Sequence, residues 1–209
     1  MDRLMPEDEL SVVRQQIEAD FAMPAEERKK RKADRIDEIL ELLILSYMYG
    51  NEAANDMLFG DDFIEDIGFT PDSTAGSTTR TIPIDVDSMN EAVYRKIADK
   101  DWEQRISDYY DSDNGTADDV YRVVDTDSHR IYNDAILNVG ERSDGAVWKT
   151  WETMKDDKVR DTHEYLQSMR VPVNSRFYTY DGDSARYPGD FVSVENNANC
   201  RCRIRLTRD

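Results

Sequence analysis

Apolar residues recur at spacings of three and four through the first sixty positions, which is the pattern of amphipathic helices. One such stripe covers residues 7–21, and Pro24 ends or restarts that helix. From Ile36 to Tyr49 the chain is apolar nearly all round, which predicts a buried helix that stops at Gly50. The stripe of the first helix consists of Leu10, Val13, Ile17 and Phe21.

The helical periodicity disappears after residue 60, where Asp, Gly, Ser, Thr and Pro predominate. This composition predicts a linker or extended arm over 61–87. Ser88 and Glu91 have the spacing of a capping box, so a helix is expected from there to the break at 111–115, and Thr116 begins another. The inward positions expected are Met89, Val93, Ile97, Trp102, Ile106 and Tyr109 in the first of these helices, and Val120, Val124, Ile131, Ala135 and Val139 in the second.

The last third of the chain changes from helical to strand-like patterns. A short helical piece is expected within residues 148–169, and runs rich in β-branched and aromatic residues follow, separated by turn formers. The sequence therefore predicts an α+β fold, in which an N-terminal helical region precedes a small mixed α/β C-terminal module with antiparallel strands. The strand-like runs are 171–174, 176–180, 190–194 and 200–206. The expected divisions are an N-terminal helical region (1–60), the linker (61–87), a helical part (88–145) and the C-terminal module (146–209).

The N-terminal and C-terminal parts of the chain differ in net charge. The formal net charge is −18, and all of the excess acid lies before residue 146. An acidic helical part disfavours nucleic acid and favours basic protein partners. The N-terminus lacks the pattern of a secretory signal, and the apolar run from Ile36 to Tyr49 contains acidic residues and is too short to span a bilayer. No membrane association is expected.

Common catalytic and nucleotide-binding patterns do not occur in this sequence. Neither G-x-G-x-x-G nor G-x-x-x-x-G-K-[ST] occurs, which excludes the usual phosphate-binding loops. Asp and Glu are so numerous that composition nominates no acid–base pair. The sequence therefore predicts no catalytic residues and no small-molecule substrate.

The only two cysteines, Cys200 and Cys202, lie in the last strand-like run. Alternation along a strand places them on the face of Ile204 and Leu206, and free cysteine behaves as a small hydrophobe. Burial without a cofactor is therefore the simplest interpretation. A Cys-x-Cys pair also cross-links almost nothing, so a reducing compartment is expected.

The alternative interpretation of the cysteines is a zinc site or a metal-dependent enzyme. Zinc binds Cys and His, so His163 is the candidate third ligand, and His129 or an Asp is the fourth. Cysteines on one face of a flat strand would lie roughly 6–7 Å apart, too wide for two ligands without a local bend. A cysteine nucleophile paired with His163 is a further alternative, although the usual glycine-flanked context is missing. An enzyme or metal-dependent factor of this kind would use Asp161 together with His163, Cys200 and Cys202.

Arginines occupy the other face of the same strand-like run. The planar guanidinium group of arginine can bind a phosphate or a carboxylate through two hydrogen bonds. This face could therefore contact an acidic partner, the acidic part of the chain itself, or DNA. Positive charge along an edge strand also protects it against aggregation, and both interpretations stay open. The arginines are Arg201, Arg203, Arg205 and Arg208.

Several motifs of the C-terminal third occur in an order that resembles the phage Mu F-like minor head protein family. They are a Trp-containing lead-in, the segment 157–163, a Val-Pro pair, a Pro-Gly-Asp turn and a terminal Asn-Cys-Arg-Cys. The resemblance covers about residues 88–205, and Asp127 stands where a Glu is usual in that family. The motif positions are Asp157, Arg160, Thr162, His163, Pro188, Asn199, Cys200 and Cys202.

The resemblance implies a minor capsid protein of a tailed phage or prophage that acts in head morphogenesis. Its expected partners are portal or major capsid subunits, with packaged DNA as a further candidate. The expected location is the virion head, after assembly in the host bacterial cytoplasm. No cofactor is expected unless the zinc alternative holds.

Overall fold

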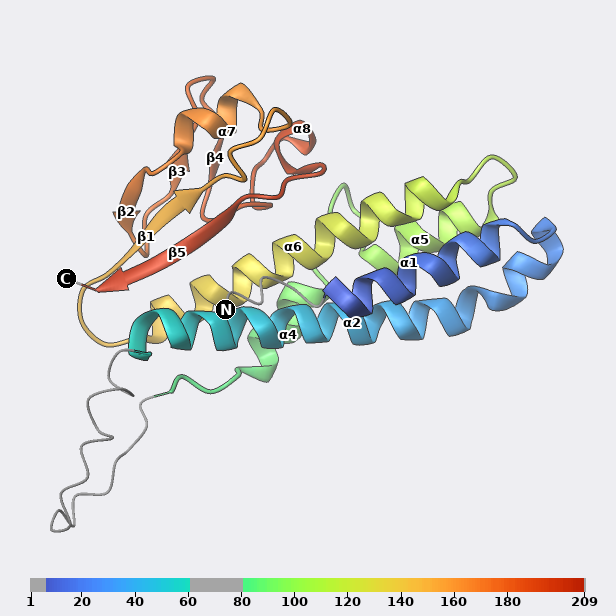
Figure 1. The fold of residues 1–209 in the computed structure, drawn as a ribbon, viewed down its shortest axis with the longest axis horizontal. Coiled ribbons are helices and arrows are strands. Elements are labelled where there is room, and N and C mark those ends of the chain that lie inside the picture. The colour runs from blue at the N-terminus through green and yellow to red at the C-terminus, as the bar shows by residue number, and fades with distance from the viewer. Residues whose placement is uncertain (1–6, 61–80, 209) are drawn as a thin grey trace, which may run out of the picture.

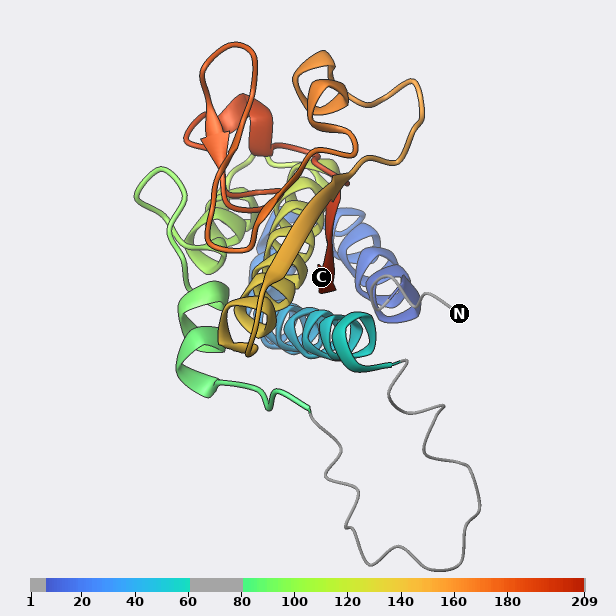
Figure 2. The same ribbon diagram turned by 90° about the vertical axis from the view of Figure 1, so that its left-hand side faces the viewer.

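Two long helices, α2 (Ala25–Phe59) and α6 (Ala117–Arg142), lie side by side through the length of the molecule in the computed structural model (Figure 1). The structure describes residues 7–60 and 81–208. Helix α1 (Glu7–Phe21) packs on both long helices, and α4 (Val86–Val93) and α5 (Trp102–Asp111) complete the helical part. A small strand-containing module sits against the C-terminal half of α6 (Figures 1 and 2). The predicted α+β class is confirmed.

The first two helices form where the apolar periodicity predicts them, but the predicted stop at Gly50 is wrong. Helix α2 continues through Gly50 to Phe59. Gly50 is buried at the crossing with α6, where a Cβ atom would stand less than 3.0 Å from the Tyr132 carbonyl oxygen. The glycine therefore serves a close approach between two helices and not a helix end.

Most of the predicted linker, residues 61–80, lies outside the described residues. The remainder of it is anchored to the end of α2. The Ile82 N–H group donates to Asn55 Oδ1 at 2.6 Å, and Asn55 Nδ2 donates to the Ile82 carbonyl oxygen at 3.0 Å.

The helix predicted from Ser88 to residue 110 is two helices, so that prediction is wrong in its start and its continuity. The N-cap of α4 is Asp85, whose carboxylate accepts from the N–H groups of Asp87 and Ser88. Helix α4 ends at Val93, and positive φ angles at Ala98 and Asp99 keep the connection to α5 non-helical, because L residues in that conformation do not continue a helix. A new capping box then begins α5, with Trp102 and Ile106 buried as predicted.

Helix α6 agrees closely with its prediction. Thr116 and Asp119 form a capping box at its start, and the acidic residues of the first turn suit the positive end of the helix dipole. The five inward positions predicted for this helix are all buried: Val120, Val124, Ile131, Ala135 and Val139.

The C-terminal module differs most from prediction. Its three-stranded antiparallel sheet has the order β2-β1-β5, and β3 and β4 form a separate hairpin. The short helical piece expected within residues 148–169 is confirmed as α7, but the first part of that segment is a strand, along which Val147, Lys149 and Trp151 all point inward. The strand expected over 190–194 is a loop that leads into a short helix. The elements are β1 (Val147–Glu152), α7 (Asp161–Leu166), β2 (Arg170–Pro172), β3 (Phe177–Tyr178), β4 (Ser184–Ala185), α8 (Val194–Asn197) and β5 (Arg203–Arg208).

Two hydrophobic clusters share the long helices. One lies among α1, α2, α4, α5 and α6, and the other lies between the ends of α2 and α6 and the module. Strand β5 contacts both α2 and α6, with Ile204 and Leu206 buried. The module is therefore attached to the helices by a continuous core. Within the described residues, no helix has both the length and the sustained apolar character that crossing a bilayer requires.

Candidate functional site

His163, Cys200 and Cys202 come together in the core of the C-terminal module. His163 Nδ1 lies 3.4 Å from Cys202 Sγ and 3.7 Å from Cys200 Sγ. All three ligand atoms lie within 4.8 Å of one another, and all three residues are buried. Helix α7 supplies the histidine, and the segment directly before β5 supplies both cysteines. This is the grouping that the zinc alternative names, without a fourth residue.

The two sulfur atoms converge because the segment that carries them is not a strand. The strand predicted over 200–206 begins only at Arg203. Just before it, Asn199 adopts a positive φ of 54°, and the Cys200 N–H group donates to the Asn197 carbonyl oxygen. The flat-strand separation expected for Cys200 and Cys202 therefore does not apply. Both cysteines are still buried beside Ile204 and Leu206, as the parity argument expects.

Aromatic side chains fix the orientation of the His163 ring. The ring stacks on Phe191 at a centroid distance of 5.2 Å and meets Trp151 edge-on at 5.6 Å. His163 Nε2 is buried and has no hydrogen-bond partner among the described residues. The imidazole is thereby held with Nδ1 facing the two sulfur atoms.

The two thiols are not equivalent. The hydrogen bond from Cys202 lowers the pKa of Cys200, and the nearby charges of Arg160 and Arg201 act in the same direction. The pKa of Cys202 is raised, first by that hydrogen bond and then by burial. The thiolate, not the thiol, is the form required both for metal ligation and for nucleophilic attack. Asp161, the third member of the enzyme alternative, is exposed and lies outside this cluster.

The motif residues around the cluster fasten α7 to the segment before β5. Arg160 Nη2 donates to the Ala198 carbonyl oxygen, and Thr162 Oγ1 donates to Asn196 Oδ1 at 3.0 Å. Together with His163, these contacts connect the start of α7 to residues 196–202. We call the contacts of Arg160, Thr162 and His163 with residues 196–202 the α7 clasp. Of the other motif residues, Asp157 is exposed, Pro188 is buried in a turn, and Asn199 provides the bend.

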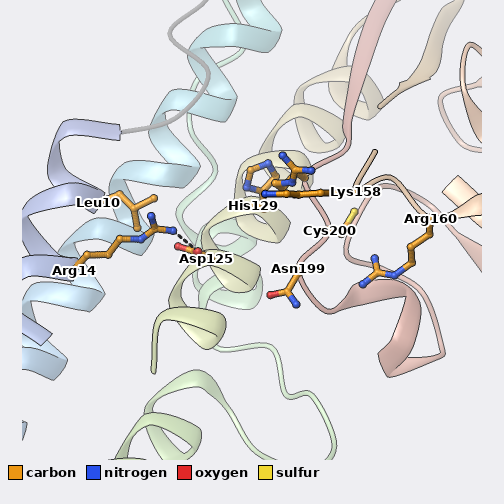
Figure 3. Close-up of a pocket in the computed structure, with 9 residues that line it drawn as sticks. Leu10, Arg14, Asp125, His129, Lys158, Arg160, Asn199 and Cys200 are labelled. Atoms are coloured by element: carbon orange, nitrogen blue, oxygen red, sulfur yellow. Dashed lines mark hydrogen bonds and ion pairs between the residues drawn. The ribbon is translucent and has the colours of Figure 1, made fainter. Parts of the chain in front are cut away.

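A groove of about 530 Å³ lies beside the cluster, between α1, α6 and the module (Figure 3). Arg14 reaches across from α1 to an ion pair with Asp125 of α6, and Lys158 and His129 also line the groove. Burial lowers the pKa of His129 to about 4, so this imidazole is neutral near pH 7. His129 lines the groove and does not join the cluster. No sequence pattern pointed to Arg14, Asp125 and Lys158, because α1, α6 and the module meet only in the folded chain.

The terminal arginines are engaged by neighbouring residues of the protein. Arg201 pairs with Asp156 at 2.8 Å, and Arg203 pairs with Glu152 at 2.8 Å. Arg205 stands 3.9 Å from Glu152 and is the most exposed of the paired arginines. Arg208 lies on the opposite face of β5 and places its guanidinium over the Phe59 ring. Their acidic partners belong to the module and not to the acidic helical part.

One comparison with known proteins gives a match. The family model described as "Phage Mu protein F like protein" matches residues 86–205, which is more than half of the chain. The match begins at α4 and includes α6, the α7 clasp and the cysteines. No curated protein and no solved structure matches the chain at a significant level.

Proposed function

Because the chain belongs to the family of phage Mu protein F-like proteins, we propose that it is a minor head protein that acts by contacts with portal or major capsid subunits during head assembly. Membership of this family indicates a phage head morphogenesis protein. The proposed location is the virion head, with assembly in the host bacterial cytoplasm. The single observation that carries this proposal is the family match.

The surface of the module supports contact with another protein. Tyr165, Tyr178 and Tyr180 are 54%, 61% and 61% exposed. The rings of Tyr165 and Tyr180 meet edge-on at 5.8 Å, and Tyr178 and Tyr180 are two residues apart. Exposed tyrosines are typical of protein interfaces, because they bury a large apolar area at little conformational cost and keep a polar hydroxyl. We call these three residues the tyrosine face.

Photo-crosslinking in purified heads tests this proposal and identifies the partner. A photoreactive phenylalanine in place of Tyr178 is expected to capture a portal or major capsid subunit. The same substitution at Tyr94, an exposed tyrosine at the end of α4, is the matched control and is expected to capture neither. Absence of the chain from purified heads would contradict the proposed function. Crosslinking of a portal or capsid subunit at Tyr94 but not at Tyr178 would agree with the proposed function but would show that the tyrosine face is not the contact surface.

We propose protein contact as the principal activity and DNA contact as a secondary one at most. The net charge of −18 repels a phosphate backbone, and Arg201 and Arg203 are already paired with carboxylates. A protein that binds DNA through phosphates loses affinity steeply as salt rises. Little binding to duplex DNA at low salt is therefore expected in a titration of the purified chain. Tight, salt-sensitive binding that Arg205→Ala weakens would restore packaged DNA as a direct partner.

A further inference from the structure

We propose that His163, Cys200 and Cys202 bind one zinc ion that cross-links α7 to the segment before β5. This inference concerns how the module is held together, and it stands or fails independently of the role in head assembly. Zinc is chosen because thiolate and imidazole ligands in a tetrahedral arrangement select it among the common divalent ions.

The distances are those of ligands around a common metal ion. With Zn–S bonds of about 2.3 Å and Zn–N bonds of about 2.0–2.1 Å, tetrahedral angles separate a sulfur from a nitrogen by about 3.6 Å. His163 Nδ1 lies 3.4 Å and 3.7 Å from the two sulfur atoms. The three side chains are therefore already arranged to bind the ion, without a change in the backbone.

Hydrogen bonding alone pairs the imidazole of this cluster with only one sulfur atom at a time. Neutral imidazole Nδ1 either accepts one hydrogen bond or donates one, yet two sulfur atoms face it at similar distances. An ion at the centre of the group would engage all three atoms at once. The stacking of the His163 ring on Phe191 and its edge contact with Trp151 supply the fixed orientation that a metal ligand needs.

The charges also balance. As each Zn–S bond forms, the thiol proton leaves to solvent, so two thiolates and a neutral imidazole surround a doubly charged cation. The resulting centre has no net charge, which removes the penalty of burying isolated ions in the module core. Loss of either cysteine would leave a net positive charge at the same place.

The fourth position of the tetrahedron belongs to water. Among the described residues, no other His, Cys, Asp or Glu ligand atom lies within the 4.8 Å range that the three share. A small opening beside the cluster is lined by Met154, Arg160 and Asn199, and it leads from solvent to both cysteines. A water molecule entering there completes the coordination.

The ion would act as a cross-link in a part of the chain with little regular structure. Between His163 and Cys200, no described strand exceeds three residues and no described helix past α7 exceeds four. Small modules of this kind commonly depend on a metal or a disulfide for stability. The α7 clasp holds the same two segments by hydrogen bonds, and the ion would lock that contact.

Metal analysis of the full chain tests the proposal. Protein purified with reductant and without chelator is expected to contain about one zinc per chain, and Co²⁺ added to the metal-free protein should give thiolate charge-transfer absorption. Removal of zinc is expected to lower the thermal midpoint and to make Cys200 and Cys202 accessible to alkylation. Re-addition of Zn²⁺ alone should reverse both changes.

The chain contains a matched control, because His129 is its only other histidine. His163→Gln and Cys202→Ser should lose the zinc, whereas His129→Gln should retain it. Circular dichroism shows whether each variant keeps its helices, most of which pack around the hydrophobic cluster of the N-terminal part and not around the zinc site. The proposal is overturned if the wild-type chain holds no zinc and gives no thiolate absorption with Co²⁺. It is equally overturned if freshly purified protein contains a Cys200–Cys202 disulfide, or if His129→Gln loses zinc as His163→Gln does.

Discussion

Gly50 of α2 packs directly on the main-chain carbonyl group of Tyr132 in α6. A Cβ atom at Gly50 would lie less than 3.0 Å from that oxygen and 2.9 Å from the Ala135 Cβ atom. The first obstacle is a backbone atom and the second is a Cβ atom, so rotation of a side chain moves neither of them. The two long helices can approach this closely only because position 50 has no side chain.

Gly50→Ala is therefore expected to destabilise the protein. Alanine gains about 1 kcal/mol of helix propensity over glycine, but forcing a methyl group into a close-packed crossing costs about 1–3 kcal/mol or more. The steric cost exceeds the gain in helix propensity because the nearest obstacle is a backbone atom that cannot move aside. Urea denaturation should show a lower free energy of unfolding. Glu52→Ala, an exposed change two residues away, should stay within about 0.5 kcal/mol of the wild type, and an equally stable Gly50→Ala protein would show that the helices can separate freely.

The same glycine shows where prediction from sequence succeeds and where it fails. Periodicity located α1 and α6 because each buries one stripe along its whole length. It misplaced the end of α2 because a glycine that stops a helix and one that permits a close crossing look alike in sequence. The break between Val93 and Trp102 was missed for a related reason, since the apolar spacing continues across two helices.

The candidate site was predicted in its chemistry but not in its geometry. His163, Cys200 and Cys202 stood out as residue types, and alternation predicted the burial of the two cysteines. Their convergence depends on the bend at Asn199, which ends the alternation that the argument assumed. The clasp contact of Arg160 with Ala198 uses a main-chain oxygen, and no side-chain pattern reports such a partner.

A buried ion pair fastens α1 to α2. Arg35 Nε donates to Asp20 Oδ2 at 2.9 Å, and the Tyr110 hydroxyl of α5 donates to the same oxygen at 2.8 Å. Asp20→Asn is expected to cost about 3 kcal/mol, because among the described residues it leaves the partly exposed Glu38 as the remaining acidic partner of the buried Arg35 charge.

Denaturant titrations of two matched variants measure this effect. Asp34 pairs with Arg31 at the surface of α2, and both side chains are substantially exposed. Asp34→Asn should therefore cost about 0–1 kcal/mol. Equal losses from Asp20→Asn and Asp34→Asn would contradict a structural role for the buried pair.

Lys149 is a buried lysine on β1 that no sequence pattern distinguished. Its Nζ has no hydrogen-bond partner among the described residues and stands 5.4 Å from the centre of the Phe177 ring. Burial lowers the pKa of Lys149 to about 8, with the charge of Arg186 acting in the same direction against Glu141 and Asp190. The unfolded chain has the ordinary lysine pKa of about 10.4 and so binds more protons between these values. The contribution of this residue to stability therefore rises with pH through that window.

Lys149→Met is expected to raise the thermal midpoint near neutral pH, because it removes a buried charge and keeps the side-chain length. The advantage over the wild type should shrink as the pH rises from about 8 towards 10. Lys96→Met, at an exposed position, should show neither effect. A Lys149→Met protein that is less stable than the wild type at neutral pH would mean that the ammonium group makes a net favourable contact with Glu141 or Asp190.

Asp183 organises the loop that leads into α8. Its carboxylate accepts hydrogen bonds from Ser193 Oγ at 2.6 Å, from Asn196 Nδ2 at 2.9 Å and from the Ser184 N–H group at 2.7 Å. Burial acts to raise the pKa of Asp183, but these hydrogen bonds to the ionised form outweigh it and lower the pKa to about 2. The unfolded value is about 3.9, so this contribution to stability is fully present above about pH 4 and is lost as the pH falls through 2.

Asp183→Asn should therefore weaken the protein at neutral pH by about 1–3 kcal/mol, the cost of losing hydrogen bonds to a charged acceptor. Unfolding free energies measured for both proteins from about pH 6 down to pH 2 should converge at the acidic end, because the wild-type carboxylate becomes protonated there. Asp113→Asn, at an exposed position after α5, should leave the whole pH profile unchanged. A constant difference between wild type and Asp183→Asn across this range would show that the amide disrupts packing and that ionisation of Asp183 contributes nothing.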